Sequence, residues 1–442
     1  MLWNLLSLLL ILILLVYSVS KWKLHPFIAL ILAAIALGFS LGMGGKQSLE
    51  VLLEGFGNTM KWIAIVVILG AFIGEVLSET GAAQRISKAV VKRTGEKKLP
   101  WAMGITGYLV SIPVFVDVAY IILQPITEAL SVKSKRPVLV LGLALTAGLT
   151  VSHTLIPPTP GPLVVASLLK VDLGKMLLIN LGVGGLAMAA GILWASKACK
   201  NQWLEYDQKL LAQKKEIDTE TEHANIPVIM DLLPILVPIL LMAAGGFLEL
   251  EEGSYSQEIL AFISTPIIAV LIGAFIAFLQ FNRTSGKAEF NRLVEQAIVK
   301  SALVIMITAA GGAFGNIIRE SGMDASLSDF FISYPALGIM LPFLLAAVLT
   351  TATGSITVSL IGTASILGPM ASEMSYSPEI MAALIGCGSF CVFHANSSFF
   401  WLLNRLHDVP VHILYKTYTP QSAVMGFSGL MLVLCLHFLG LA

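Results

Sequence analysis

The chain has 442 residues, of which 57% are hydrophobic and only 12% are charged, and its formal net charge at pH 7 is zero. A soluble domain usually carries about a quarter charged residues, so this composition excludes a cytosolic enzyme, and the balanced charge implies no nucleic-acid partner. The apolar residues come in long unbroken runs instead of alternating singly, which also excludes a transmembrane β-barrel.

The apolar content predicts a helical protein that crosses a membrane many times. About 250 apolar residues, at roughly 20 per span, would fill about twelve spans. The first run has no basic residue before it and no small-x-small cleavage site, so we expect a retained helix and not a signal peptide. The runs predict ten crossing helices: Leu2–Ser18, Leu24–Met43, Trp62–Leu77, Pro137–Thr154, Leu173–Ser196, Val228–Leu248, Ile259–Phe281, Ala297–Ile318, Pro378–Phe393 and Ala423–Leu441.

Two further apolar stretches, Pro100–Leu130 and Pro335–Met370, are too long for one crossing and carry Pro or Gly near their middles. Such interruptions are tolerated in a membrane only where the backbone lines a protein cavity. We therefore expect re-entrant hairpins or broken helices at both places.

One long hydrophilic stretch divides the chain. We expect a first transmembrane repeat over residues 1–196, a solvated cytoplasmic linker over 197–225 and a second, inverted transmembrane repeat over 226–442. If each interrupted stretch returns to its own side, basic residues favour one side by about four to one. The positive-inside rule then places that side in the cytoplasm and both termini in the periplasm.

A shift of about 241 positions aligns the helix breakers of the two halves without a gap. Gly70 and Gly74 align with Gly311 and Gly315, and His153 aligns with His394. An odd number of crossings in each half makes the repeats inverted. Inverted repeats with broken helices are typical of secondary transporters, whose binding site lies where the halves meet.

Four polar clusters lie within the apolar runs, where polar side chains are costly and ask for a partner or a function. Residues 111–117 contain a single acidic side chain. Residues 150–162 contain four prolines within six positions, which cannot continue a helix, so we expect freed carbonyls and hydroxyls to face a cavity. Residues 350–359 form a hydroxyl-rich, glycine-broken run whose amides suit a carboxylate. Residues 394–398 (HANSS) are the repeat equivalents of the second cluster.

Each cluster also has a structural interpretation, because a carboxylate can be paired within the fold and hydroxyls can hold helices together. Histidine titrates near neutral pH and could couple a proton gradient to affinity. The candidate residues for proton or ion coupling are Asp117, His153 and His394. The candidate substrate-binding residues are Ser111, Pro113, Ser152, Thr159, Gly354, Ser355, Thr357, Asn396 and Ser397.

The cysteines indicate no metal or disulfide. The four cysteines show no CxxC spacing, and Cys387 and Cys391, inside an apolar run, are expected to be small buried thiols. We expect no catalytic residue, no metal and no organic cofactor.

Six stretches also match a known family in order and over most of the chain: GEVLSETGAA (74–83), PVFVDVAYIILQP (113–125), HTLIPPTPGP (153–162), GGAFGNIIRESG (311–322), GSITV (354–358) and HANSSFFW (394–401). Through them the chain resembles the gluconate permease (GntP-type) family of bacterial proton symporters, within the larger ion transporter superfamily. The resemblance implies a multi-pass protein of the bacterial inner membrane that imports a sugar acid such as gluconate together with a proton.

Three positions depart from that family's pattern. The family commonly has histidine where Thr159 stands, arginine near Thr350 and aspartate where Ser397 stands. Each departure replaces an ionisable group with a hydroxyl, although an arginine fork is the natural partner of a carboxylate. This leaves open a less charged substrate, such as a polyol or an amino acid, and sodium in place of the proton.

The hypothesis is an alternating-access carrier whose partners are a small organic acid and the lipid bilayer, with a homo-oligomer possible. Elevator and rocking movements both remain open. One rival is a membrane-embedded metal-dependent enzyme that uses His153 and His394, although zinc would need three or four ligands. A passive channel is the other rival, although channel filters are usually symmetric rings of ligands.

Overall fold

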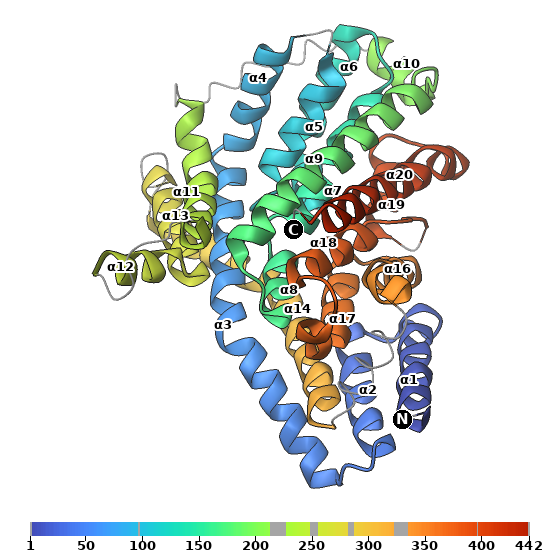
Figure 1. Ribbon diagram of the computed structural model, residues 1–442. Coiled ribbons are helices and arrows are strands. Elements are labelled where there is room, and N and C mark those ends of the chain that lie inside the picture. Colours follow the sequence, from blue (N-terminus) through green and yellow to red (C-terminus); the bar gives the residue numbers. More distant parts are fainter. Residues whose placement is uncertain are drawn as a thin grey trace.

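The computed structural model describes residues 2–95, 98–212, 227–247, 255–281, 287–321, 335–395 and 397–440, and all regular secondary structure within these ranges is helical (Figure 1). The helices of the first half are α1 (Leu2–Ser20), α2 (Pro26–Ser40), α3 (Gly45–Glu79), α4 (Ala82–Thr94), α5 (Leu99–Val110), α6 (Val116–Ser134), α7 (Val138–Leu155), α8 (Pro160–Leu169) and α9 (Leu173–Ala198). After α10 (Glu205–Ala212) come α11 (Val228–Phe247), α12 (Tyr255–Ser264), α13 (Pro266–Phe281), α14 (Lys287–Glu320), α16 (Pro335–Thr353), α17 (Ile356–Leu367), the 3₁₀ helix η2 (Gly368–Glu373), α18 (Pro378–Ser389), α19 (Ser398–Leu406) and α20 (Val411–Phe438).

Fewer helices than predicted have the length of a full membrane span. Six described helices are long and apolar enough to cross a membrane, and the bent pair α12–α13 makes a seventh. The other three predicted spans correspond to shorter apolar helices. The apolar segment of α1 is Leu6–Val19. Helix α2 has 15 residues and α18 has 12. A 15-residue helix is about 22 Å long, whereas the apolar bilayer core is roughly 30 Å thick. Length and composition therefore support seven of the ten predicted crossings, and the remaining three stay a prediction.

Four predicted spans also have different bounds. Trp62–Leu77 is the end of the 35-residue helix α3, Ala297–Ile318 is the second part of the 34-residue helix α14, and Ala423–Leu441 is the second half of α20. More polar sequences that belong to the same helices precede all three. Ile259–Phe281 is two helices that meet at 69°. The bend falls at Pro266, which lacks a backbone donor and clashes with the preceding turn.

The two long helices α3 and α14 pack at a short distance because each has a glycine where they cross. A methyl group at Gly312 would lie 1.9 Å from the Thr59 hydroxyl, and one at Gly55 would lie 2.6 Å from Cβ of Asn316. Small residues allow this close approach between membrane helices, where the hydrophobic effect does not drive association. The same device joins α5 to α7, where a methyl group at Gly148 would lie 1.9 Å from the Gly104 carbonyl oxygen.

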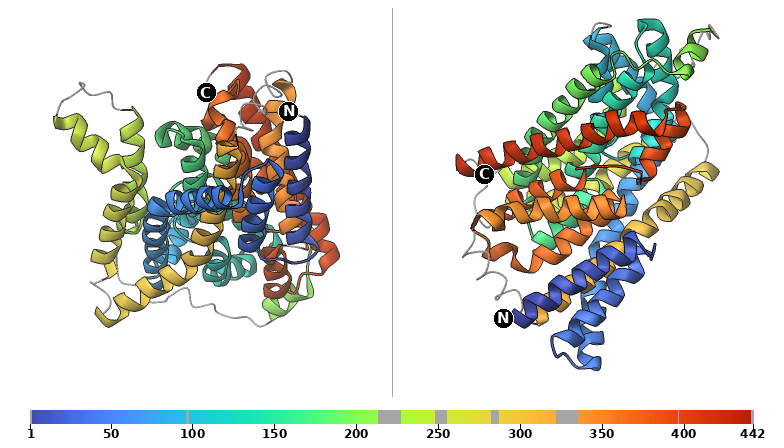
Figure 2. Two further views of the ribbon diagram at one scale, coloured as in Figure 1. Left: turned by 90° about the horizontal axis from the view of Figure 1, so that it is seen from below. Right: turned by 90° about the vertical axis from the view of Figure 1, so that its right-hand side faces the viewer.

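Helices α11 to α13 project to one side of the other helices (Figure 2). A buried ion pair connects them to the first half: Arg85 Nη2 lies 2.7 Å from Asp231 Oδ1, and Arg85 Nε donates to Asp231 Oδ2 at 2.9 Å. The side chains are only 10% and 2% exposed. This two-pronged geometry satisfies both buried charges and fixes α4 against α11.

Helix α10 corrects the prediction of a wholly solvated linker over 197–225. Asp207 of α10 is 2% exposed, and its carboxylate accepts from the amides of Leu204 at 2.8 Å and Val138 at 2.7 Å. Burial raises the pKa of this carboxyl, while the two amide hydrogen bonds oppose the increase. The first part of the predicted linker is therefore folded onto the start of α7, and residues 213–225 lie outside the described ranges.

Both predicted interruptions are present. Helices α5 and α6 are separated by residues 111–115, α16 and α17 by residues 354–355, and the members of each pair contact each other. The proline-rich cluster likewise separates α7 from α8. The division into two inverted repeats at residues 196 and 226 stays a prediction.

The Asp207 carboxylate predicts a measurable contribution to stability. Asp207→Ala should lower the free energy of unfolding by about 1 kcal/mol, as loss of a helix cap usually does, because it leaves two buried amides unpaired. Thermal denaturation in detergent would measure this, with the exposed neighbour Gln208 changed to Ala as the control. An unchanged melting temperature in Asp207→Ala would contradict the role.

Candidate substrate-binding cavity

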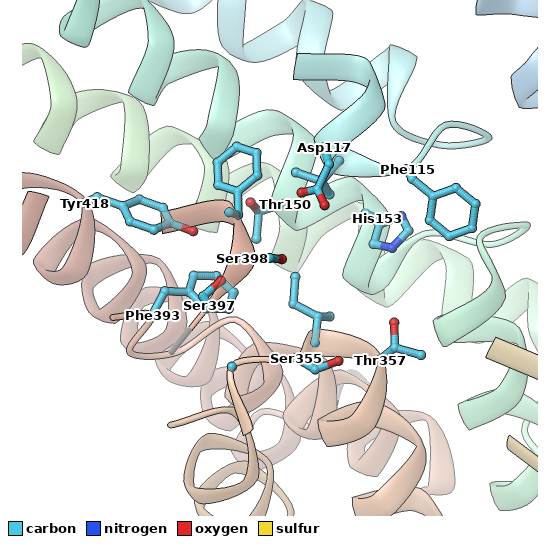
Figure 3. Close-up of a pocket in the computed structure, with 14 residues that line it drawn as sticks. Phe115, Asp117, Thr150, His153, Ser355, Thr357, Phe393, Ser397, Ser398 and Tyr418 are labelled. Atoms are coloured by element: carbon cyan, nitrogen blue, oxygen red, sulfur yellow. The ribbon is translucent and has the colours of Figure 1, made fainter. Parts of the chain in front are cut away.

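A cavity of about 210 Å³ lies where the interrupted helices of both halves meet (Figure 3). Its walls come from the start of α6, the last turns of α7, the α16–α17 break, the α18–α19 connection and α20. The lining residues are Phe115, Val116, Asp117, Thr150, His153, Gly354, Ser355, Ile356, Thr357, Phe393, Ser397, Ser398, Phe399 and Tyr418. They include one acidic residue, one histidine, six hydroxyl groups and neither lysine nor arginine.

Asp117 presents its carboxylate to the open space of the cavity (Figure 3). It lies in the first turn of α6, which starts after the break at residues 111–115, and it is exposed to solvent. Within the described ranges the structure gives its carboxylate no hydrogen bond or ion pair. A helix N-terminus stabilises a nearby negative charge, so the position can hold an ionised carboxylate without a counter-ion.

Thr150 and His153 enter the cavity from α7, whose residues are all buried. The His153 ring packs against Phe115 with 5.6 Å between ring centroids. Its Nδ1 atom is buried and has no hydrogen-bond partner among the described residues. A buried, unsatisfied ring nitrogen beside the cavity is free to accept or donate a proton when a ligand or water enters.

The α16–α17 break supplies a second helix N-terminus. Gly354 adopts φ = +72°, a conformation that L residues adopt only with strain. Ser355 then caps α17, and its hydroxyl accepts from the Val358 amide at 3.3 Å. The first amides of a helix have no partner within the helix, so this cavity wall can receive an anionic or hydroxyl oxygen.

The α18–α19 connection supplies a third N-terminus, at Ser397 and Ser398. The backbone amide of Phe393 donates to the Ser422 hydroxyl of α20 at 2.9 Å, which ties this connection to α20. Asn396, a predicted binding residue, lies outside the described residues.

The structure brings half of the predicted site residues to this cavity: Asp117, His153, Gly354, Ser355, Thr357 and Ser397. His394 does not line it, because its Nε2 lies 2.9 Å from the Thr351 carbonyl oxygen. The hydroxyl of Ser111 donates to the Val114 carbonyl at 3.0 Å and closes the α5–α6 break. Ser152 is fully buried in α7.

Pro113 and Thr159 line a separate small space behind Phe115 and His153. The Thr159 hydroxyl donates to the Ile156 carbonyl. Thr350 also points away from the cavity and donates to the Ser389 carbonyl at 2.8 Å. Of the three positions that depart from the family pattern, only Ser397 therefore reaches the cavity.

The cavity also contains aromatic residues that the sequence did not single out: Phe393, Phe399 and Tyr418. Tyr418 precedes the expected start of the last helix, and aromatic residues in apolar runs usually pack in the core. The nearby Pro420, which lies inside the continuous helix α20, is the one available signal. Away from the cavity, Glu75 of α3 forms an ion pair with Lys300 of α14, whose Nζ lies 2.6 Å from Glu75 Oε1.

These features define a class of protein: a polytopic helical membrane transporter with interrupted helices around one small polar cavity. No cluster of three or more histidine, cysteine or acidic side chains that could hold a metal occurs in the part of the chain that the structure describes. The GntP family permease model matches residues 3–439, and the chain belongs to this family of transporters, which are not enzymes.

Three relatives match this chain over most of their length and nearly all of its own. The chain is 32% identical to a permease of Haemophilus influenzae over 438 residues (95% of this chain, 89% of the relative). It is 30% identical to a gluconate permease of Zymomonas mobilis (97% and 96% covered) and 29% identical to the D-serine transporter DsdX of Escherichia coli K12 (99% and 99%).

Solved structures show the same fold. The YdaH transporter of Alcanivorax borkumensis superposes with a TM-score of 0.68 at 14% identity, covering 93% of this chain and 98% of that one. MtrF of Neisseria gonorrhoeae gives a TM-score of 0.70 at 16% identity, with 96% and 97% covered. The fold is therefore that of a known class of multi-pass transporters.

The two histidines should differ in their effect on transport. His153→Gln should lower the uptake rate at least about tenfold, the equivalent of about 1.4 kcal/mol, because its ring lines the cavity. His394→Gln should cost less than about threefold, because glutamine can still donate to the Thr351 carbonyl. Uptake by cells, normalised to the amount of each variant in the membrane, would test this. Equal losses would contradict the assignment.

Proposed function

We propose that the protein imports gluconate or a related small hydroxy acid by proton symport with alternating access. The observation that carries the proposal is the cavity itself, where a carboxylate on α6 faces hydroxyl groups and the N-termini of α17 and α19. Its volume of about 210 Å³ is below the range of roughly 300–1,000 Å³ of drug-sized sites. A small metabolite is the expected occupant.

The cavity walls match the parts of a hydroxy acid. The open amides at the starts of α17 and α19 are suitable for its carboxylate, because helix N-termini favour anions. The hydroxyls of Thr150, Thr357 and Tyr418 lie on the surrounding walls (Figure 3) and can exchange hydrogen bonds with the substrate's hydroxyl groups. A site built to hydrogen-bond hydroxyls rejects analogues that lack them.

The charge of the cavity gives a reason for proton coupling. An anionic substrate and an ionised Asp117 would repel each other, and no lysine or arginine lines the cavity to offset this. Two like charges about 4 Å apart at an effective dielectric constant of 20 repel by about 4 kcal/mol. Protonation of Asp117 removes the repulsion, so substrate and proton would bind together. His153 is the second group in the cavity that can exchange the proton.

A small amino acid is the second candidate, and the unpaired carboxylate of Asp117 favours it. The ammonium group of a zwitterion would pair with ionised Asp117 while the carboxylate occupies a helix N-terminus. The relative named as a D-serine transporter carries such a molecule. The two candidates require opposite protonation states of Asp117, and sodium could replace the proton if Asp117 stays ionised.

Uptake into proteoliposomes would separate these candidates. An inward proton gradient should drive accumulation of labelled gluconate, and a sodium gradient should not. Asp117→Asn, which imitates the protonated acid, should retain gluconate exchange but lose proton-driven accumulation at least about tenfold. For a zwitterion the same change should abolish binding. Glu50→Gln, at an exposed carboxylate on α3, is the matched control. If neither gradient drives accumulation of any sugar acid or amino acid, the symporter proposal fails.

We further propose that the protein lies in the bacterial inner membrane with both termini in the periplasm. The support is the four-to-one distribution of basic residues in the predicted loops and the positive-inside rule. Alkaline phosphatase fused after residue 442 should be active, and the same enzyme fused after Ala212 should be inactive. The reverse pattern would overturn the proposed orientation. Whether copies associate stays a prediction.

A further inference from the structure

A buried polar chain leads away from the cavity along α6. Tyr120 lies one helical turn after Asp117 and is fully buried. Its ring packs edge-on against Phe399, a cavity residue, with 5.4 Å between centroids. Its hydroxyl lies 2.9 Å from Nε2 of His407, which follows the last turn of α19.

The chain continues from His407 to Glu128, two turns further along α6. Nδ1 of His407 lies 3.9 Å from Oε1 of Glu128 and has no hydrogen-bond partner in the described part of the chain. The same carboxylate oxygen accepts from Gln124 Nε2 at 2.7 Å and from the Tyr206 hydroxyl of α10 at 2.6 Å. The His407 side chain is completely buried, whereas that of Glu128 is 15% exposed. Glu128 is therefore the member of the pair that reaches the molecular surface.

The neighbouring helix α7 leaves room for the hydrogen bond between Tyr120 and His407. Gly142 of α7 lies opposite it, and a methyl group there would come 2.4 Å from the Tyr120 hydroxyl and 3.9 Å from His407 Nε2. Besides Tyr120, Glu128 and Tyr206, the titratable group near the ring is Asp408, which is exposed on the adjoining turn. A completely buried histidine whose ring nitrogen lacks a hydrogen-bond partner costs free energy. Such a residue next to an acid therefore calls for a functional explanation.

We propose that the His407–Glu128 pair is a second proton-holding site, connected to the cavity through Tyr120. In the transfer, a water molecule that enters from the cavity accepts the carboxyl proton of Asp117 and gives a proton to the Tyr120 oxygen as the Tyr120 proton passes to Nε2 of His407. Asp117 becomes a carboxylate, Tyr120 is unchanged, and His407 becomes an imidazolium whose charge is balanced by the Glu128 carboxylate. Asp117 and Glu128 are eleven residues apart, about 16 Å along the helix.

This site gives the proton a route to water that the substrate does not use. Chains of acidic residues and histidines carry protons in this way through membrane proteins. The inference rests on the proposed proton symport, because a sodium-coupled carrier would have no use for it.

Two variants test the site without removing its hydrogen bonds. His407→Gln can still bond to Tyr120, and Glu128→Gln can still accept from Tyr206, but neither side chain can exchange a proton at neutral pH. In proteoliposomes with pyranine inside, each should lower proton-driven accumulation of labelled gluconate, and the accompanying change in lumen pH, at least about tenfold. Gluconate exchange between equal concentrations should stay within about twofold. Labelled D-serine serves as the probe if the wild type exchanges that solute instead.

Glu205→Gln, at an exposed carboxylate on α10, is the matched control, because it removes an acidic group from the helix that carries Tyr206 but not from the proton route. It should leave accumulation and exchange unchanged. Wild-type accumulation in His407→Gln, or loss of exchange together with accumulation, would overturn the proton site and indicate a structural role. A wild type that exchanges its substrate but shows no proton-driven accumulation would instead refute the proposed symport.

Discussion

A backbone that leaves its helix within an apolar environment must find partners for its polar groups, and this constraint governs the structure. Unpaired peptide groups cost several kcal/mol in a medium without water. Four chain breaks meet this requirement in one region. They comprise residues 111–115, 156–159, 354–355 and the described part of the α18–α19 connection (390–395 and 397), and each lies at or next to the cavity. Side chains satisfy part of each break, as Ser111 does for the Val114 carbonyl. The amides that remain open at the starts of α17 and α19 belong to the wall of the cavity that we propose as the binding site.

Close helix packing holds these breaks in position. Gly74 of α3 lies against the first break, where a methyl group would come 2.4 Å from the Pro113 carbonyl oxygen. Gly148 allows α7 to lie directly on α5, and α7 in turn carries Thr150 and His153. Small residues thus act at a distance from the cavity, because any larger side chain would displace the backbone that carries the polar groups.

The sequence predicted the residues whose chemistry conflicts with an apolar run. Asp117 and Gly354 are a lone carboxylate and a helix breaker, and both reach the cavity as expected. Sequence could not predict that His394 bonds to the Thr351 carbonyl, because the direction of a side chain in a loop depends on the packing of neighbouring helices. Tyr418 was not predicted, because an aromatic residue is common in an apolar helix and does not conflict with its surroundings. The bend at Pro266 had a visible cause but lies in a run of the length expected for one span.

In the mechanism that we propose, helix α6 joins substrate and proton handling in a single element. Its first turn carries Asp117 at the cavity, its second turn carries Tyr120, and its fourth carries Glu128 next to α10. His407 faces this helix from the end of α19, whose other end forms a cavity wall at Ser397 and Ser398. A displacement between α6 and α19 would therefore change the cavity and the Tyr120–His407 contact at the same time. Coupling requires that the occupancy of one site alters the other, and two helices that share both sites meet that requirement without a longer pathway.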